Sequence, residues 1–309
     1  MPDAAIAMTL IGAIYFPEWL DENALEIGRF SVKWYGLAYI VGWALALWVG
    51  IRTVARRELF APTAISSAPT RGVALVPDRT VLEDFAFWLL IGIIVGGRLG
   101  SAILYQPEKY LADPLAILRV WEGGMAFHGG FLGVCAAIYL FARAKKLEIF
   151  RLSDIASIGA PIGLGLGRLA NFVNQELWGR PTDVPWAFIF NKDMSGLPRH
   201  PSQLYEAALE GALLFAIIFW LTRKRGILAK PGIASGVFIG GYGLFRFFVE
   251  FFREPDPIPQ VHEYFTRGMA YSLPMIVVGA LMVAWAVRRP PAAPRFMADA
   301  EPARETVAA

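Results

Sequence analysis

The amino-acid sequence predicts an all-α polytopic membrane protein with seven transmembrane helices and a small periplasmic head between spans four and five. Hydrophobic residues make up 56% of the 309 positions and charged residues only 18%, and the mean hydropathy is +0.47. An average soluble domain is about a quarter charged. The apolar residues also cluster into seven runs, each close to the roughly 20 residues that cross a bilayer.

The seven runs define the expected spans and the expected domain organisation. In chain order they are Trp34–Val54, Asp84–Tyr105, Phe127–Ala144, Ile155–Val173, Leu204–Leu221, Ala234–Phe252 and Gly268–Val287. A single membrane domain is therefore expected over residues 1–289, with the head at 174–202. The remainder, 290–309, has the composition of a disordered cytoplasmic tail.

The distribution of Lys and Arg predicts the orientation. The segments 51–81, 143–151, 223–230 and the tail from residue 288 contain 17 of the 29 Lys and Arg, whereas the opposite segments contain nine. Positively charged loops stay on the cytoplasmic side. The N-terminus is therefore expected outside and the C-terminus inside.

Shorter segments carry weaker signals. The apolar run 4–16 ends at Pro17 and suits an interfacial helix better than a signal peptide. The Ala, Ser and Pro-rich segment 56–79 is expected to be a flexible connector. Aromatic residues at 186–190 favour a short strand or an interfacial belt. The single cysteine, Cys135, excludes an intrachain disulfide and is expected to be a buried, inert thiol.

Three arginines lie inside apolar spans and require a reason. Arg98, Arg168 and Arg246 each place a guanidinium where burial in lipid costs about 2.5 to 3.5 kcal/mol, and arginine does not lose its proton to escape this cost. Few acidic residues share these spans. The sequence therefore predicts an anionic ligand, and a phospholipid head group is the best candidate in a membrane.

Two helices carry polar ridges. Arg168 and Asn171 share one face of the fourth span, where a guanidinium fork suits phosphate oxygens. Tyr242, Arg246 and Glu250 are spaced i, i+4 and i+8 on the sixth span. An intrahelical ion pair between Arg246 and Glu250 is the simpler explanation, but such pairs contribute little stability, so a function is favoured.

Two further features lie near the expected outer ends of the spans. Glu206 and Glu210 are i and i+4 on span five, and their expected counter-ions are Arg168 and Arg246, which favours a structural role. His128 precedes two glycines at the start of span three. A lone histidine is usually only a polar residue with a satisfied partner, but its pKa suits proton transfer, so a catalytic or substrate-contacting role is favoured.

The motifs that are missing exclude several chemistries. The sequence contains no Gly-x-Ser-x-Gly, Walker or His-Glu-x-x-His motif, and no aspartate cluster for magnesium. Its three histidines have no metal-ligand spacing, so neither a metal nor another cofactor is expected. Nothing in the charge pattern suggests nucleic acid. A Gly-Arg-Leu element occurs at both 97–99 and 167–169, which is weak evidence for an internal repeat.

Five ordered segments resemble the signatures of the prolipoprotein diacylglyceryl transferase family. They are residues 34–37 (WYGL), 119–130 (RVWEGGMAFHGG), 167–180 (GRLANFVNQELWGR), 199–206 (RHPSQLYE) and 241–253 (GYGLFRFFVEFFR). The likeness extends from about residue 30 to 288. One departure is visible, because the family usually has glycine where Ala170 stands, and the extra methyl group affects a close helix contact rather than the chemistry.

The resemblance implies an enzyme of the bacterial inner membrane. It transfers the diacylglyceryl group of phosphatidylglycerol to the lipobox cysteine thiol of a preprolipoprotein and releases glycerol phosphate, the first step of lipoprotein maturation. The essential positions implied by the family are Tyr35, His128, Arg168, Asn171, Glu176, Gly179, Tyr242, Arg246 and Glu250.

Residue chemistry and resemblance together suggest a mechanism. Arg168 and Arg246 are expected to bind the phosphate and stabilise the charge that develops on it. The nucleophile is the substrate thiolate, and His128 is the candidate base, with Glu176 or a phosphate oxygen as alternatives. A non-enzymatic transporter of an anionic lipid or solute would also use buried arginines and glycine-rich helices. A purely structural scaffold would not explain the intramembrane cations.

Overall fold

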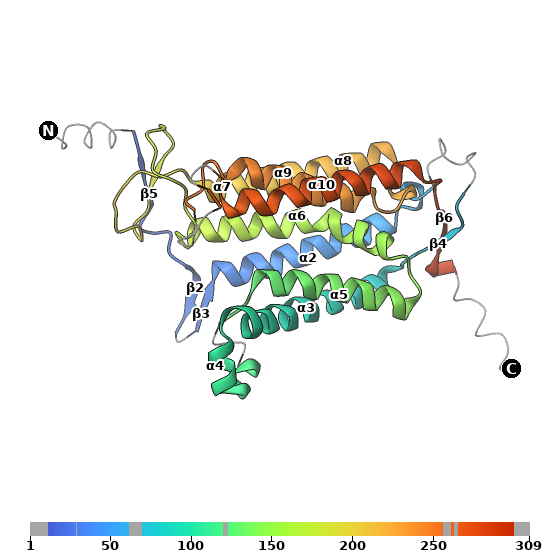
Figure 1. The fold of residues 1–309 in the computed structure, drawn as a ribbon, viewed down its shortest axis with the longest axis horizontal. Helices are drawn as coiled ribbons and strands as arrows, with labels where there is room; N and C mark the ends of the chain where they lie inside the picture. Colours follow the sequence, from blue (N-terminus) through green and yellow to red (C-terminus); the bar gives the residue numbers. More distant parts are fainter. Residues whose placement is uncertain are drawn as a thin grey trace. The chain divides into compact units, whose positions relative to one another are not determined.

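The computed structural model describes residues 12–28, 30–61, 70–119, 123–255, 261–262 and 265–299. Within these residues it is mostly helical (Figure 1), and six helical segments are long and apolar enough to cross a membrane. They are α2 (Trp34–Val54), α3 with the π-helical turn η3 (Arg79–Gly100 and Ser101–Tyr105), α5 (Phe127–Lys145), α6 (Ile149–Val173), α7–η6–α8 (Ser202–Glu206, Ala207–Leu213 and Leu214–Arg225) and α10 (Arg267–Arg288). The chain is therefore a multi-pass membrane protein.

The helix α9 (Ile233–Val249) occupies the place of the expected sixth span but has only 17 residues. It ends before the expected boundary because the following chain pairs with another segment. Gly179 forms an antiparallel bridge with Arg253, and the Arg180 amide donates to the Phe252 carbonyl at 2.8 Å. The Phe252 carbonyl is thus engaged by Arg180, while the amides of Phe252 and Arg253 still donate to the Val249 carbonyl.

Short elements connect the long helices. They are the helical segments η1 (Arg57–Leu59), α4 (Pro107–Ala112), η4 (Pro114–Leu118), η7 (Ile227–Ala229) and η8 (Met297–Asp299), and the strands β1 (Ile14–Tyr15), β2 (Asn23–Ile27), β3 (Phe30–Lys33), β4 (Val73–Val76), β5 (Phe188–Ile189) and β6 (Ala293–Phe296). Strands β2 and β3 pair antiparallel, whereas β1 pairs with β5, and β4 with β6, in parallel.

Three expectations for these short segments need correction. The described part of the expected interfacial helix contains β1, whose backbone bonds to the head strand β5; residues 4–11 lie outside the described part of the chain. The described parts of the connector 56–79 and of the tail after residue 290 contain β4 and β6, and their pairing satisfies backbone groups that each segment alone would leave to water. Residues 62–69 and 300–309 lie outside the described part of the chain. The strand expected near residues 186–190 is confirmed as β5.

The described chain divides into two compact units. The first comprises residues up to 49, 156–227 and 232–288, and the second comprises 50–155, 228–231 and the chain from 289. In the second unit α3 packs along α5, because Gly92, Gly96 and Gly100 leave room for Gly129 and Gly133. Cys135 lies outside this contact and is exposed, which corrects the expected burial.

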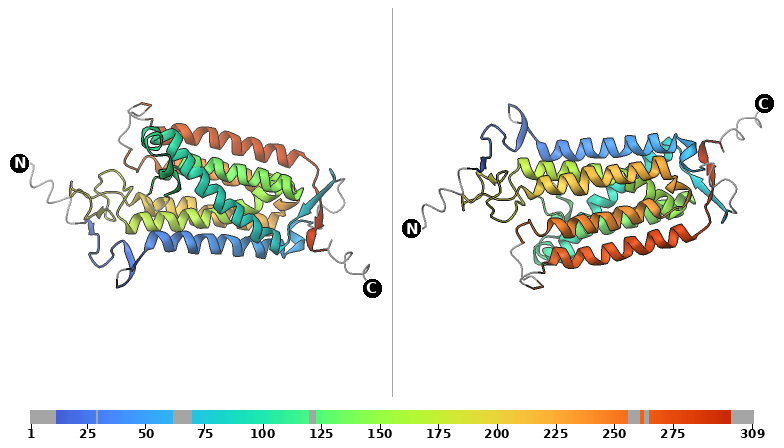
Figure 2. Two further views of the ribbon diagram at one scale, coloured as in Figure 1. Left: turned by 90° about the horizontal axis from the view of Figure 1, so that it is seen from below. Right: turned by 90° about the horizontal axis from the view of Figure 1, so that it is seen from above.

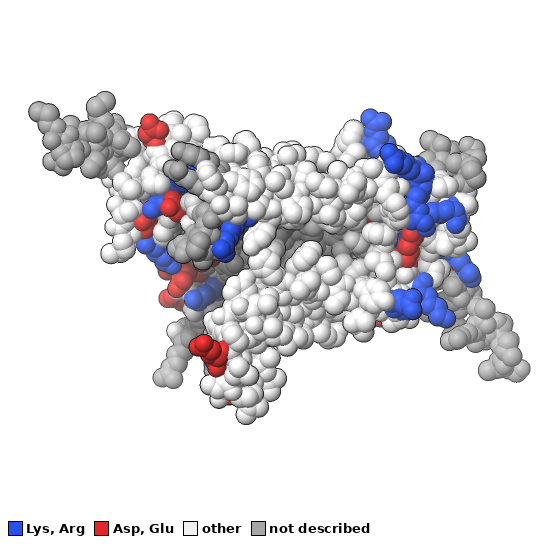
Figure 3. All heavy atoms as spheres, in the orientation of Figure 1, with Lys and Arg blue, Asp and Glu red and all other residues white. Residues whose placement is uncertain are grey.

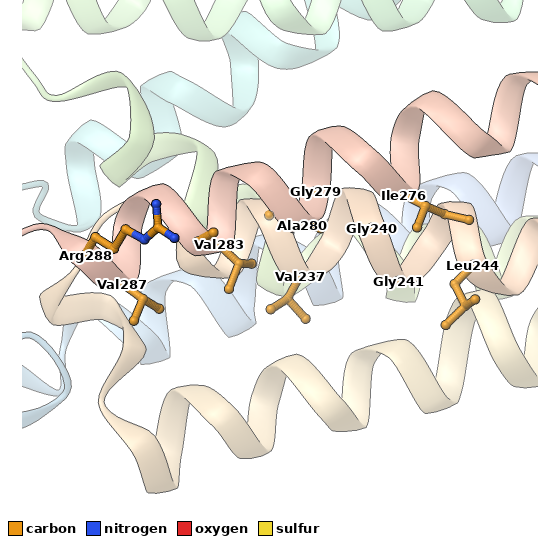
Figure 4. Close-up of a pocket in the computed structure, with 12 residues that line it drawn as sticks. Val237, Gly240, Gly241, Leu244, Ile276, Gly279, Ala280, Val283, Val287 and Arg288 are labelled. Atoms are coloured by element: carbon orange, nitrogen blue, oxygen red, sulfur yellow. The ribbon is translucent and has the colours of Figure 1, made fainter.

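In the first unit α9 and α10 run side by side (Figures 1 and 2), again through small residues: a Cβ atom at Gly240 would lie 3.4 Å from the Gly279 Cα. Between these two helices lies an apolar groove of about 600 Å³, lined by residues such as Val237, Leu244 and Ile276, with Arg288 at the end of α10 (Figure 4). None of the residues that the sequence singles out for chemistry lines this groove.

On the described surface, basic side chains gather at helix ends. The last turn of α8 carries Arg223, Lys224 and Arg225, and the last turn of α10 carries Arg288. Figure 3 shows basic side chains gathered where these helices end and an uncharged surface along their length. Exposed apolar side chains such as Ile40 and Leu281 cover the helix faces between the ends. This distribution is typical of helices that face lipid.

A glycine pair tests the packing of the first unit. A Cβ atom at Gly211 would lie 2.6 Å from the Gly165 Cα, so a side chain there requires the backbones to move apart, whereas one at Gly163 meets no atom within 4 Å. Gly211→Ala is expected to lower the free energy of unfolding by about 1 to 3 kcal/mol. Thermal unfolding in detergent measures this effect. Gly163→Ala is the control, and equal midpoints for the two variants would contradict the assigned contact.

Candidate active site

A fully buried carboxylate organises the polar interior of the first unit. Glu206 has no exposed surface and receives three guanidinium groups. Its Oε2 lies 3.0 Å from Arg168 Nε, and its Oε1 lies 2.7 Å from Arg246 Nη1 and 3.3 Å from Arg253 Nη1. Arginines from α6 and from the α9 end therefore converge on one acid of the fifth spanning segment.

Two more acids complete this cluster. Glu250 Oε2 lies 2.8 Å from Arg246 Nη2, which confirms the intrahelical pair, and buried Glu210 lies 3.7 Å from Arg168 Nη2. Arg168 and Arg246 are thus confirmed as counter-ions of Glu206 and Glu210. Three arginines face three glutamates. The expected shortage of buried acid around Arg168 and Arg246 is therefore wrong.

Exposure separates the cations from the acid that anchors them. The Arg168 and Arg246 side chains remain 19% and 16% exposed, while Glu206 is inaccessible. Tyr242, one turn before Arg246 on α9, hydrogen-bonds Arg168 through its hydroxyl. The ridge predicted on α9 therefore meets the ridge predicted on α6. Each guanidinium has five N–H donors, and the ion pairs of Arg168 and of Arg246 each engage two of its nitrogens.

A second polar group adjoins the end of α6. Asn171 Nδ2 donates to Glu176 Oε1 at 2.7 Å and to the Tyr35 hydroxyl at 3.4 Å. The Tyr35 ring lies 5.0 Å from the Tyr39 ring. The structure thus brings together three of the predicted site residues, Tyr35, Asn171 and Glu176. Tyr39 was not singled out from the sequence, although its position four residues after Tyr35 on one helix was the available signal.

Gly179 has a different place from the other predicted residues. Its amide donates to the His200 carbonyl at 2.9 Å, and a Cβ atom there would lie 2.6 Å from both the Cβ and the carbonyl oxygen of His200. Two backbones therefore approach too closely for any side chain. This contact explains the glycine without a direct contact to substrate.

Polar residues bind the loop 174–202 to itself and to the helix ends. The side-chain amide of Gln203 donates to the main-chain carbonyl of Glu176 at 2.7 Å, and the Ser202 hydroxyl donates to the main-chain carbonyl of Leu177 at 3.1 Å. Arg199 bonds Asp193, and its Nη1 lies 3.2 Å from Glu254 Oε2. Burial lowers the pKa of His200, whose Nδ1 lies 3.1 Å from the Tyr205 hydroxyl.

His128 belongs to the second unit. It is exposed at the start of α5, and its Nδ1 lies 2.9 Å from the Tyr105 hydroxyl. Arg98 belongs to the same unit and corrects the sequence argument. Its buried guanidinium bonds main-chain carbonyls, and no carboxylate among the described residues pairs with it. Main-chain oxygens engage all three nitrogens of its guanidinium.

The described residues contain no group of three or more His, Cys, Asp or Glu side chains that could hold a metal ion. Within them the chemistry of the site consists of guanidinium, carboxylate, phenol, amide and imidazole groups.

Comparison with known proteins decides the family. The sequence profile described as prolipoprotein diacylglyceryl transferase matches residues 22–285 of this chain. The chain belongs to the prolipoprotein diacylglyceryl transferase family. Among its relatives, the phosphatidylglycerol–prolipoprotein diacylglyceryl transferase of Bordetella bronchiseptica is 44% identical over 90% of this chain and 99% of its own length. The enzyme of the same name from Methylocella silvestris is 46% identical over 87% of this chain and 95% of its own length.

The Glu206 cluster makes a stability prediction for this family member. Glu206→Gln removes the charge shared by three guanidinium groups. Removing one partner of a buried ion pair lowers the free energy of unfolding by about 3 to 5 kcal/mol, because the other charge stays buried without compensation. Denaturant unfolding in detergent should show a loss of this size. The control is Glu254→Gln, because Glu254 is 46% exposed and its pair with Arg199 should contribute under about 1 kcal/mol. Similar small losses in both variants would contradict the central role of Glu206.

The loop 174–202 makes a pH-dependent prediction. Burial opposes ionisation of Asp193, but hydrogen bonds from Arg199 and Ser195 outweigh it and leave its pKa below the usual value. Ionised Asp193 therefore stabilises the fold above its unfolded-state pKa of about 3.9, and this contribution is lost as the pH falls through the lower folded-state pKa. Asp193→Asn should lower the thermal midpoint at pH 7, with the difference from wild type shrinking below about pH 4. A difference that grows on acidification would contradict this assignment.

Proposed function

We propose that this chain is a phosphatidylglycerol–prolipoprotein diacylglyceryl transferase. It transfers the diacylglyceryl group from phosphatidylglycerol to the thiol of a lipobox cysteine in a preprolipoprotein, the first step of bacterial lipoprotein maturation. The observation that carries the chemistry is the pair of partly exposed guanidinium groups, Arg168 and Arg246, fixed on the inaccessible carboxylate of Glu206. Family membership supports the same activity.

Arg168 and Arg246 bind the lipid phosphate through N–H groups that their ion pairs leave available. Because three glutamates balance three arginines, the cluster is stable before lipid binds, and the donors are aimed in advance. A phosphate then gains directed hydrogen bonds rather than an unneutralised charge. Tyr242 and Glu250 orient the two guanidinium groups, one by a hydrogen bond to Arg168 and the other by an ion pair with Arg246.

The reaction forms one bond and breaks one. The cysteine sulfur attacks the glycerol carbon of the diacylglyceryl group, and the bond from this carbon to the phosphate oxygen breaks. Glycerol phosphate leaves with the electron pair, and the negative charge that grows on its phosphate is stabilised by the arginines. The thiol proton passes to a base, for which His128 is the candidate and Glu176 or a phosphate oxygen the alternatives.

The second polar group contributes to substrate binding in this proposal. Asn171 links Glu176 to Tyr35, so an amide, a carboxylate and a phenol present hydrogen-bonding groups one turn from Arg168. Such groups suit the hydroxyls of the lipid head group or the main chain of the peptide. Gly179 acts indirectly, by allowing the close backbone contact at His200.

The membrane arrangement is part of the proposal. The 17 residues of α9 reach the lower limit of the roughly 17 to 25 that span a bilayer, which makes seven crossings with the six longer segments. The loop 174–202 then forms a periplasmic head, the N-terminus is periplasmic and the C-terminus is cytoplasmic, in agreement with the 17 basic residues expected inside against nine outside. The membrane is the bacterial inner membrane.

A mass measurement tests the activity and distinguishes it from lipid transport. Purified protein mixed with phosphatidylglycerol and a lipobox peptide should increase the peptide mass by one diacylglyceryl group. Arg246→Ala should lower the rate by about 100-fold or more, the scale for removing a charge-stabilising donor. His128→Gln should also be impaired. The absence of peptide modification by wild type would favour a transporter, and a wild-type rate in Arg246→Ala would exclude the proposed phosphate contact.

A further inference from the structure

Arg98 is a buried cation with an unusual set of partners. Arg98 lies in the last turn of α3, and only 3% of the residue is exposed. The centroid of the Tyr110 ring lies 5.2 Å from the central carbon of the Arg98 guanidinium. All of its described hydrogen bonds go to main-chain oxygens. Nε donates to the Ile117 carbonyl at 2.9 Å. Nη1 donates to the carbonyl of Gly123 and also to that of Gly124, the latter at 3.2 Å. Nη2 donates to the carbonyls of Ala116 at 2.5 Å and Arg119 at 2.8 Å.

These acceptors all precede the helix that carries His128. Gly123 and Gly124 have φ angles of +79° and +80°, a backbone conformation that L side chains rarely adopt, and both present their carbonyls to Arg98. A Cβ atom at Gly124 would lie 3.0 Å from Arg98 Nη1, whereas one at Gly123 would meet nothing within 4 Å. The backbone at Gly123 and Gly124 is therefore shaped around the guanidinium.

The last turn of α3 and the π-helical turn η3 that follows it contact the chain on either side of His128. The Ala126 amide donates to the Gly97 carbonyl at 2.9 Å, which attaches the start of α5 to the residue before Arg98. On the other side, the π-helical turn that follows α3 places the Tyr105 hydroxyl 2.9 Å from His128 Nδ1. Wide turns of this kind are frequent at functional sites.

We propose that Arg98 is a positioning residue for His128, acting through the loop that its guanidinium gathers, without touching substrate. The inference rests on the proposed transferase function, in which His128 works on the reacting groups. Only arginine suits the task, because a planar fork with five N–H donors can serve carbonyls in several directions, whereas the lysine ammonium has three donors at a single point.

The first test compares buried arginines of the same unit. Arg98→Lys is expected to lower the peptide-lipidation rate by about 30-fold or more and to increase hydrogen exchange of the amides at 123–130. Arg151→Lys is the control, because Arg151 is also fully buried and bonds a main-chain carbonyl, that of Leu228. It should retain a rate within about threefold of wild type even if its thermal midpoint falls. A wild-type rate in Arg98→Lys overturns the proposal, while inactive wild-type protein would instead overturn the function on which it rests.

The second test separates positioning from general stability. Arg98→Ala leaves a set of main-chain carbonyls that methylguanidinium can bind. Adding this cation should raise the lipidation rate of the variant at least tenfold and leave its thermal midpoint unchanged. Arg151→Ala should gain nothing from it. If Arg98→Ala does not fold, Gly124→Ala provides the same test, because its methyl group pushes on Arg98, and Gly123→Ala is its matched control with a similar φ. Equal lipidation rates in these two glycine variants overturn the inference. It is also overturned if the rates of both Arg98 variants fall only in proportion to the loss of folded protein.

Discussion

The buried carboxylate of Glu206 is the interaction on which the candidate site depends. Three guanidinium groups from two other segments converge on it, and leaving any of them uncompensated in a low-dielectric interior would be costly. The acid therefore determines where Arg168 and Arg246 point. Because neutralisation comes from within the chain, both arginines can remain partly exposed and in place without a lipid, which is the condition for preorganised binding.

Two solutions for a buried arginine coexist in this chain. Arg168 and Arg246 are balanced by carboxylates and remain 19% and 16% exposed, whereas Arg98 is 3% exposed and satisfied by main-chain oxygens. In the first arrangement the guanidinium groups stay partly accessible, and in the second the guanidinium N–H donors are hydrogen-bonded to main-chain oxygens. The Gly-Arg-Leu element at 97–99 therefore does not have the chemistry of the one at 167–169. The two arrangements therefore differ in residual exposure and in the type of partner.

Elements and contacts with a periodic, local sequence signal could be predicted from the sequence. The ridge of Tyr242, Arg246 and Glu250 follows from helical spacing alone, and the pair between Arg246 and Glu250 is present. The apolar runs identified the long helices for the same reason. Strands β4 and β6 could not be predicted, because each is too short to show a pattern and pairs with a partner more than 200 residues away. Sequence reasoning also missed Tyr39, which has the same helical spacing from Tyr35 but no charge to draw attention to it.

The sequence by itself determined the membrane class and the family, and it singled out most of the polar residues that the structure brings together, because apolar run length and residue spacing on a helix are local properties. Only the tertiary structure decided the partners of those residues. It showed that Glu206 balances three arginines at once, that Gly179 serves a backbone contact, and that the Arg98 guanidinium bonds main-chain oxygens. The physical reason is that the energy of a buried charge depends on every group that surrounds it in space, and those groups come from segments whose distance along the chain carries no information about their contact.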